Sequence, residues 1–299
     1  MPKQRLHQVH KQTPNYKLQI KNYTLNIMEA HIYSTPMGDI HYWCTPFEAG
    51  KRTLVMLPGL TASSRLFEKQ IEAFIGEYNL WVWDAPAHAK SRPFALRFTL
   101  AQQAQWLHDI LSRYITDGSL PVLVGQSMGG YVAQEYLAQY PGQAAGFVSI
   151  GSAPLDREYV TSAELWMLRH AKPFYKLFPW KTLQKMGVMG CAETDYGRRL
   201  MQEMMQEYTH TEYCNLAGYG YTILADAIAQ HTAPIPLCPT LLLVGNHDHA
   251  GSAKRYDREW SHRRNLPLHI VPHAGHNANT DNPDYVNEEI QNFANTLPN

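Results

Sequence analysis

The sequence lacks the features that mark several large classes of protein. Only four of its 299 residues are cysteines, and no two of them form a C-x-x-C pair. The simplest interpretation is free thiols in a reducing compartment. Lys+Arg and Asp+Glu both total 26, so no excess of positive charge predicts binding to nucleic acid or to an anionic membrane surface. No apolar run approaches the roughly 20 residues that a membrane span requires. Residues 1–21 lack the apolar segment of a secretory signal, and we therefore expect a cytoplasmic protein without nucleic-acid or membrane partners.

Motifs for common cofactors and metals are also missing. There is no G-x-x-x-x-G-K phosphate loop, and no dinucleotide fingerprint follows the first apolar runs. Histidine is abundant at 15 residues, and His247-Asp248-His249 and His273-x-x-His276 could in principle combine as metal ligands. Neighbouring residues at a strand end point in different directions, however, and neither H-E-x-x-H nor a paired cysteine motif is present. We expect no organic cofactor and no metal.

What the sequence does contain is a serine motif near its middle. The apolar run 122–124 leads into Gly125-Gln126-Ser127-Met128-Gly129, and a helix-forming segment follows at 131–139. The motif fits G-x-S-x-G, which sets a serine on a tight strand-to-helix turn. In so sharp a turn, side chains at the two glycine positions would collide. The N-terminus of the following helix points N–H groups at any negative charge that forms at the serine. Taken alone, the residues would also fit an ordinary strand–loop–helix connection.

A hydrolytic serine on such a turn needs an acid and then a base later in the chain. Asp248 follows the apolar run 241–245, and His276 follows the run 268–271. Both therefore stand just beyond a strand-like segment, in the order that the chemistry requires. The wide gap between the serine and the acid leaves room for an inserted segment.

Four blocks in this order resemble those of the serine α/β-hydrolases. They are the turn 58–61, the loop 84–91, the serine motif, and the later acid and base. The resemblance covers about 26–293, most of the chain. It implies an α/β-hydrolase fold: a mostly parallel, doubly wound sheet with an inserted helical cap, or lid.

The pattern of the chain agrees with that fold class. Hydrophobic residues make up 44% and charged residues 17%, which is typical of a soluble globular protein with a sizeable core. Strand-like runs alternate with helical segments, as in a doubly wound parallel sheet, and a β-hairpin is predicted within 23–44. The expected organisation is an extension at 1–22, a core at 23–154 and 237–299, and a helical insert at 155–236.

The insert is rich in methionine and aromatic residues. Packing of the insert onto the sheet would explain each of them singly. As a group they favour an apolar pocket, because the insert falls where the family carries its lid and because methionine side chains adapt to varied apolar groups. The candidates for substrate contact are Met201, Met204, Met205 and Trp166.

The resemblance implies a role for each residue of the site. Ser127 would be the nucleophile, His276 the base that takes its proton, and Asp248 the acid that orients His276. The backbone N–H groups of Leu60 and Met128 would form the oxyanion hole. In the family the block before the first of these donors usually reads His-Gly. Here a proline replaces the histidine, which keeps the amide donor but loses any hydrogen bond from the histidine side chain.

Two assignments have neighbours that compete for the same role. Asp156 follows the run 146–150, at a position where some relatives place the acid. Asp248 is preferred because it ends a clear apolar strand, whereas Asp156 begins the insert. His273 lies nearer its strand than His276, which is preferred as the base because it occupies the family's loop position.

The loop 84–91 resembles the D-x-P-G-H-G-x-S block of the family. Ala87 and Ala89 stand where glycines are common, so we expect the loop to manage without left-handed backbone conformations there. We interpret His88 as structural and Asp84 as a carboxylate that pins the loop.

These observations predict a cofactor-independent serine hydrolase that cleaves a carboxylic ester of a small, largely apolar substrate through an acyl-enzyme. Thioesterases, lactonases, perhydrolases and carbon–carbon bond hydrolases share the same blocks, and the fold does not choose among them. An alternative of another class is a ligand-binding protein with a vestigial triad. The expected partner is a small-molecule acyl substrate, and the sequence says nothing about oligomeric state.

Overall fold

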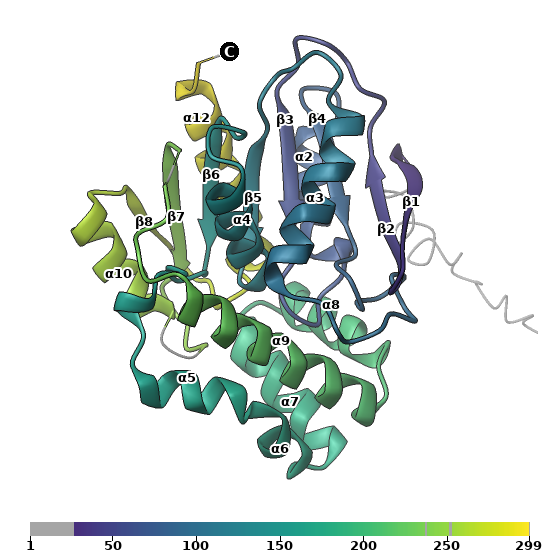
Figure 1. The fold of residues 1–299 in the computed structure, drawn as a ribbon, viewed down its shortest axis with the longest axis vertical. Helices are drawn as coiled ribbons and strands as arrows, with labels where there is room; N and C mark the ends of the chain where they lie inside the picture. Colours follow the sequence, from purple (N-terminus) through teal and green to yellow (C-terminus); the bar gives the residue numbers. More distant parts are fainter. Residues whose placement is uncertain (1–26, 237, 251–252, 299) are drawn as a thin grey trace, which may run out of the picture.

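The computed structural model describes residues 27–236, 238–250 and 253–298 (Figure 1). The expected extension at 1–22 lies outside the described residues. Within them, eight strands form one sheet in the order β1-β2-β4-β3-β5-β6-β7-β8. The strands are β1 (Glu29–Thr35), β2 (Gly38–Cys44), β3 (Thr53–Leu57), β4 (Asn79–Trp83), β5 (Val122–Gln126), β6 (Gly146–Ile150), β7 (Thr240–Gly245) and β8 (Leu268–Val271).

The sheet is parallel apart from its first two strands. β1 and β2 form the hairpin that the sequence predicts, and β2 also pairs antiparallel with β4. The remaining neighbours pair in parallel. Every residue of β3 to β7 is buried, as continuous apolar strands require when helices cover both faces.

Helices lie on both faces of this sheet. In Figure 1, α3 and α4 stand in front of the sheet and α2 and α12 stand behind it. The first turn of α3 is held by a capping box between Thr99 and Gln102, which satisfies N–H groups that have no partner within the helix. The helices outside the insert are η2 (Ser64–Phe67), α2 (Glu68–Phe74), α3 (Leu100–Tyr114), α4 (Met128–Gln139), α10 (Ala253–Arg264), α11 (Ala278–Asp281) and α12 (Pro283–Thr296).

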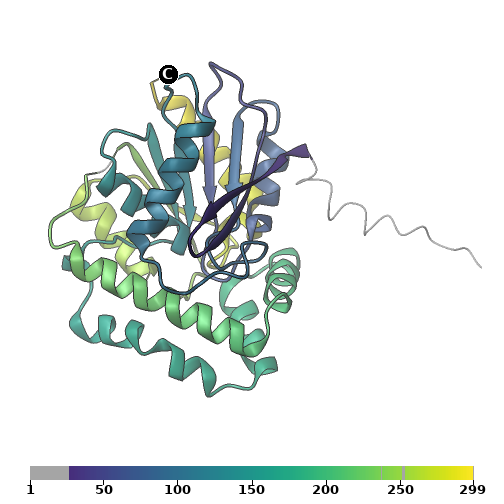
Figure 2. The same ribbon diagram turned by 45° about the vertical axis from the view of Figure 1, so that its right-hand side comes forward.

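Between β6 and β7 the chain forms a separate helical layer. α9 runs across one end of the sheet, and α5 and α6 pack against the side of α9 that faces away from the strands (Figures 1 and 2). A capping box of Thr161 and Glu164 begins α5. The elements of this layer are η3 (Arg157–Tyr159), α5 (Ser162–Arg169), α6 (Ala171–Lys176), α7 (Trp180–Cys191), α8 (Asp195–Gln206) and α9 (His210–Gln230).

The start and the end of the insert are tied together at its base. Asp156 accepts a hydrogen bond from the Ile235 amide at 2.9 Å, and the Arg157 amide donates to the His231 carbonyl at 2.8 Å. His231 Nε2 lies 2.8 Å from a carboxylate oxygen of Glu135 on α4. These contacts fix how the helical layer leaves the sheet and returns to it.

Candidate active site

Ser127 occupies a sharp turn between β5 and α4. Its backbone has φ 49° and ψ −118°, a conformation that costs an L residue about 1–3 kcal/mol. The glycines of the motif are needed for steric reasons: a Cβ at Gly125 would lie 2.5 Å from the Gly130 Cα, and one at Gly129 would lie 1.9 Å from the Leu57 carbonyl oxygen. The turn that the sequence motif predicts is therefore present. It holds the serine side chain between the sheet and the helical layer.

Asp248 and His276 form a buried pair beside this turn. His276 Nδ1 lies 2.9 Å from Asp248 Oδ2, and the side chains are 11% and 1% exposed, respectively. Burial alone would raise the pKa of the Asp248 carboxyl. The charge of His276 and the hydrogen bonds from His276 and the Ala250 amide outweigh burial, so the pKa falls below its ordinary value. An ionised Asp248 accepts the proton on Nδ1, which leaves Nε2 of a neutral imidazole free to accept another.

Two neighbouring residues affect the His276 side of the pair: Gly151 leaves space for it, and Gln126 bonds to it. A Cβ at Gly151 would lie 3.2 Å from both Asp248 Oδ2 and His276 Nδ1, so only glycine leaves full room for the hydrogen bond. Gln126 donates from Nε2 to the His276 carbonyl at 3.2 Å. The end of β5 is thereby joined to the histidine loop.

Sequence reasoning missed Asp281, which connects the histidine loop to the helical layer. Its carboxylate accepts from the amides of Gly275, Glu193 and Thr194 at 2.8–2.9 Å, and from the Thr194 hydroxyl at 2.8 Å. Carboxylates that accept several N–H groups make strong, directional hydrogen bonds. The only sequence signal for Asp281 is its position shortly after the predicted base.

The two predicted oxyanion donors come from the turn after β3 and from the start of α4. Met128 is the first residue of α4. Leu60 is brought close by its neighbour, since a Cβ at Gly59 would lie 3.1 Å from the Ser127 Cβ. Among the described residues, neither the Leu60 nor the Met128 amide donates to a protein acceptor. An unpaired N–H group is what an oxyanion hole requires of each donor.

Two cavities meet at Ser127. The first has a volume of about 290 Å³ and is called here the Met201 cavity. The second has a volume of about 470 Å³ and is called the Met167 cavity. Both are lined by Leu60, Ser127, Tyr175, Cys191, Tyr221, Ala250 and His276. Leu183, Met186 and Ala217 extend the first cavity, and Met128, Leu168 and Leu224 extend the second. The space around Ser127 thus has two mainly apolar branches with two tyrosines, Tyr175 and Tyr221, at their junction.

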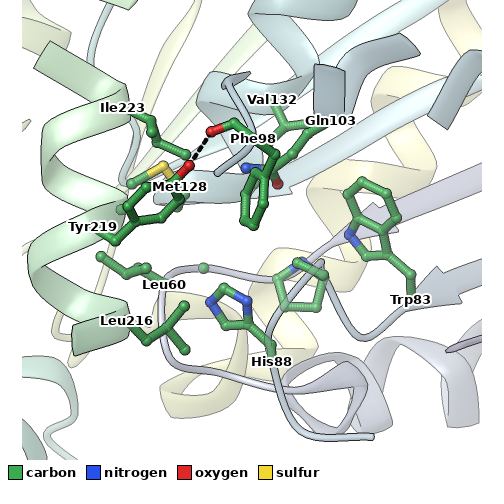
Figure 3. A pocket seen from close by; sticks show the side chains of 15 residues that line it. Leu60, Trp83, His88, Phe98, Gln103, Met128, Val132, Leu216, Tyr219 and Ile223 are labelled. Atoms are coloured by element: carbon green, nitrogen blue, oxygen red, sulfur yellow. Dashed lines mark hydrogen bonds between the residues drawn. The ribbon is translucent and has the colours of Figure 1, made fainter. Parts of the chain in front are cut away.

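A third, much smaller cavity lies behind the Leu60 loop (Figure 3). Leu216, Tyr219 and Ile223 reach it from α9, and its volume is about 10 Å³, which is about the size of one water molecule. His88 lines it, with Nδ1 3.0 Å from the Pro86 carbonyl. Burial lowers the pKa of His88 to about 4, so its ring is neutral near pH 7. This cavity is too small for an acyl group.

Of the three methionines predicted to contact substrate, Met201 alone lines a cavity at Ser127. Met201 lines the Met201 cavity. Met204 is buried, and its sulfur accepts from the Ser63 amide at 3.4 Å. Met205 is buried against Gly187 of α7. Neither Met204 nor Met205 lines a cavity at the serine, because the buried face of α8 meets the neighbouring elements as well as the site.

Trp166, the fourth candidate for substrate contact, lines neither cavity at Ser127. Its side chain is 61% exposed and stacks on the His170 ring at 4.3 Å. α5 is a short helix whose inward face presents Leu165 and Leu168. Trp166 projects from the opposite side.

The loop 84–91 keeps its predicted role but not its predicted backbone. Asp84 accepts from the Ser64 amide at 2.7 Å and from the Lys90 amide at 3.0 Å, so it pins the loop as expected. Ala87 and Ala89, however, adopt φ values of 71° and 37°. The expectation that the loop avoids left-handed conformations is wrong. The hydrogen bond from the Lys90 amide to Asp84 and that from the Ala89 amide to the Tyr208 hydroxyl at 3.2 Å fix the loop in a geometry that glycine adopts more easily.

Asp156 and His273 were the alternatives to Asp248 as the acid and to His276 as the base. Asp156 is buried at the base of the insert, and His273 is exposed.

Within the described residues, no group of three or more His, Cys, Asp or Glu side chains is arranged to hold a metal ion. No helix in that part of the chain is long and apolar enough to span a membrane.

Comparisons with known proteins agree with this architecture. A model of the alpha/beta hydrolase family matches residues 54–289. Carboxylesterase YbfK of Bacillus subtilis (strain 168) is 25% identical over 287 residues, covering 89% of this chain and 87% of the relative. The crystal structure of carboxylesterase CesB (YbfK) from the same species has a TM-score of 0.63 at 20% identity, covering 93% and 96% of the two chains. The Cif epoxide hydrolase from Acinetobacter nosocomialis has a TM-score of 0.72 at 15% identity, covering 92% and 94%. Since the family model spans most of the sequence, the chain belongs to the alpha/beta hydrolase family and is a hydrolase.

Proposed function

We propose that the protein is a serine carboxylesterase that uses Ser127, His276 and Asp248 as a catalytic triad. The observation that carries the proposal is the buried Asp248–His276 hydrogen bond beside a serine in a strained turn, at the junction of two apolar cavities. Carboxylesterase YbfK, which aligns over most of the chain, supports the same reaction class.

The reaction begins with proton transfer from Ser127 Oγ to His276 Nε2 as Oγ attacks the ester carbonyl carbon. The carbonyl oxygen gains the negative charge and accepts hydrogen bonds from the Leu60 and Met128 amides. Collapse of this intermediate breaks the bond to the alcohol, which leaves with the proton held by His276. Asp248 stabilises the imidazolium while it exists. Water then adds to the acyl-enzyme by the same steps and releases the acid.

The two cavities define the substrate class. A carbonyl held at Ser127 has one apolar branch of about 290 Å³ and another of about 470 Å³, so both arms of the ester can be buried. The helical layer formed by residues 155–236 acts as the lid over this site, and 23–154 with 237–299 form the core. The four free cysteines favour a reducing compartment, the cytoplasm.

A fluorophosphonate and an ester panel test the proposal. The protein should gain one phosphonyl group at Ser127, detected by mass spectrometry, and should hydrolyse short aryl esters faster than matched thioesters and lactones. The Ser127→Ala variant should take no label and should lose on the order of a millionfold in kcat. A variant that keeps substantial activity, with contaminating esterase excluded, would remove the mechanism. Preference for thioesters or lactones would keep the triad and change the substrate class, and labelling without turnover of any acyl substrate would favour a ligand-binding role.

A further inference from the structure

The outer helices of the lid expose an unusual number of large apolar side chains. Ten such side chains are exposed in the described part of the chain, and six of them fall between residues 166 and 189. Leu177, on the loop after α6, is the most exposed at 78%. The others are Trp166 and Met167 on α5, Phe174 on α6, and Met186 and Met189 on α7. We call these six residues the lid face.

Basic residues accompany the lid face. From residue 162 to residue 191 the chain has five basic side chains and one acidic side chain, although its overall charge is zero. The one acid, Glu164, is paired with Arg255, and Arg169 is paired with Asp226. The four lysines are exposed, and none forms an ion pair with another described residue; they are Lys172, Lys176, Lys181 and Lys185. The segment 162–191 therefore combines exposed apolar side chains with four exposed lysines that no described carboxylate pairs with, although the stem of Lys172 packs against Gly218 of α9.

This surface also surrounds the entrances to the site. Phe174 and Met186 line the Met201 cavity, and Met167 lines the Met167 cavity. All three are about half exposed, at 55%, 46% and 56%, respectively. Each cavity thus runs from Ser127 to the lid face. Apolar side chains at both entrances would offer an acyl chain a path that avoids water.

Packing within the protein does not account for the exposed set. α9 lies between α5–α6 and the sheet, so these two helices form the outermost layer of the molecule (Figures 1 and 2). Phe174 and Met186 line the same cavity, so these two exposed side chains lie close together. Exposed apolar side chains that gather in this way on a soluble protein mark an interaction site. Short helices that combine aromatic and aliphatic side chains with lysines lie at the surface of lipid bilayers.

We propose that the lid face docks onto an anionic lipid surface, from which acyl substrates enter the two cavities. The entry of substrate depends on the esterase function proposed above, whereas the docking does not. Absence of a net positive charge led the sequence analysis to expect no anionic surface as partner. The structure concentrates positive charge on one part of the molecule, where lipid electrostatics act locally, within about a Debye length.

Charge complementarity selects lipid over a second copy of this chain. A two-fold contact through the lid face would bring the four lysines of one copy near the same four of the other, with Glu164 already paired. An anionic bilayer supplies the opposite charge and accepts the apolar side chains between its headgroups. A second copy is therefore an outcome to be tested.

The experiment measures vesicle binding by co-flotation of the full chain carrying Ser127→Ala, so that no turnover occurs. Phosphatidylcholine vesicles are compared with and without phosphatidylglycerol, at low and high salt. Binding should need the anionic lipid and should weaken at high salt. Replacing the four lid lysines by glutamine should lower the partition coefficient several hundredfold, since each contributes about fivefold. Leu177→Ser should lower it about tenfold.

Matched variants locate the surface. Ile32 on β1 is 58% exposed, so Ile32→Ser controls for loss of an exposed apolar side chain. Arg258 on α10 is exposed, so Arg258→Gln controls for loss of charge. Both should bind vesicles as before. When Ser127 is kept as serine, the variant with the four lysines replaced should hydrolyse a soluble short-chain ester at the same rate as the unaltered chain.

Three results would overturn the docking proposal. The first is no binding to anionic vesicles. The second is binding that the lid substitutions leave unchanged, or that Arg258→Gln weakens equally. The third is a dimer in solution that Leu177→Ser dissociates, which would assign the lid face to a second copy. Failure of ester hydrolysis with intact vesicle binding would instead contradict only the esterase proposal.

Discussion

Replacement of Asp248 by asparagine tests the proposed triad most sharply, because the structure dictates which way the new amide faces. The carboxylate uses Oδ1 to accept from the Ala250 amide at 2.8 Å and Oδ2 to accept from His276 at 2.9 Å. An asparagine must keep its oxygen on the Ala250 side, or else it leaves a buried N–H group unpaired at a cost of about 1–3 kcal/mol. Its NH₂ group then faces His276 Nδ1.

An NH₂ group at that place stabilises the wrong tautomer of His276. Nδ1 must accept, so the proton moves to Nε2, which can no longer take the proton of Ser127. We expect kcat to fall about ten-thousandfold, which corresponds to about 5 kcal/mol of transition-state stabilisation. The fold should persist, since the shape of the side chain is retained.

Asp156→Asn is the matched control, since both carboxylates are buried. Its oxygen can still accept from the Ile235 amide, and the lost contact with Arg264 is already long at 3.8 Å. We expect kcat to stay within a factor of about three and the unfolding free energy to fall by about 1 kcal/mol. Stopped-flow hydrolysis of p-nitrophenyl butyrate, with circular dichroism to verify the fold, measures both. Loss of activity in Asp156→Asn with near-normal activity in Asp248→Asn would refute the assignment of the acid.

Four other substitutions probe further features of the structure. Gly151→Ala places a Cβ 3.2 Å from both atoms of the Asp248–His276 hydrogen bond, at a residue whose φ is 57°. We expect kcat to fall on the order of tenfold or more and the unfolding free energy to fall by about 1–2 kcal/mol. Unchanged kinetics would contradict the role given to the space at Gly151. The hydrogen bond from His231 to Glu135 raises the pKa of His231 above 6.5, so its contribution to stability is complete below pH 6.5 and is lost as pH rises through the folded-state pKa. Urea unfolding across that range should show this loss in the native chain and not in His231→Gln, and identical pH profiles would refute it. Met201→Ala should move the preferred acyl chain to longer esters, by about 0.8 kcal/mol per added methylene. Met205→Ala should instead lower stability by about 2–5 kcal/mol without changing the preference, and equal shifts in both variants would contradict the placement of these side chains.

The order of strands and helices was determined by local pattern. Apolar runs at 53–57 and 146–150 became β3 and β6 with the same bounds, because a strand covered on both faces needs apolar residues throughout. The turn at Ser127 could also be predicted, since its glycines contact atoms only a few residues away or on the adjacent strand. Asp248 and His276 could be placed at one edge of the sheet because each follows a parallel strand.

Contacts between distant segments were decided only by tertiary structure. Asp281 contacts Thr194, and Gly151 leaves space for His276; no local pattern reports such pairs. The alanines of the loop 84–91 adopt left-handed conformations in a loop held by distant partners: the Ala89 amide donates to the Tyr208 hydroxyl, and Asp84 accepts from the Ser64 and Lys90 amides. A propensity describes one residue and cannot include a partner at the end of another strand.

The lid shows most clearly which features follow from local sequence pattern and which depend on tertiary structure. The helical spacing of Met201, Met204 and Met205 puts them on one face of α8, and that face is buried. It could not predict that Met201 reaches a cavity while the other two pack against neighbouring elements, because periodicity identifies a buried face but not what covers it. Trp166 was expected inside for its apolar character, yet the packing of α5 on α9 left it exposed. Which apolar side chains meet substrate, the protein core or an outside surface depends on how the helices are arranged in space, and that arrangement exists only in the folded chain.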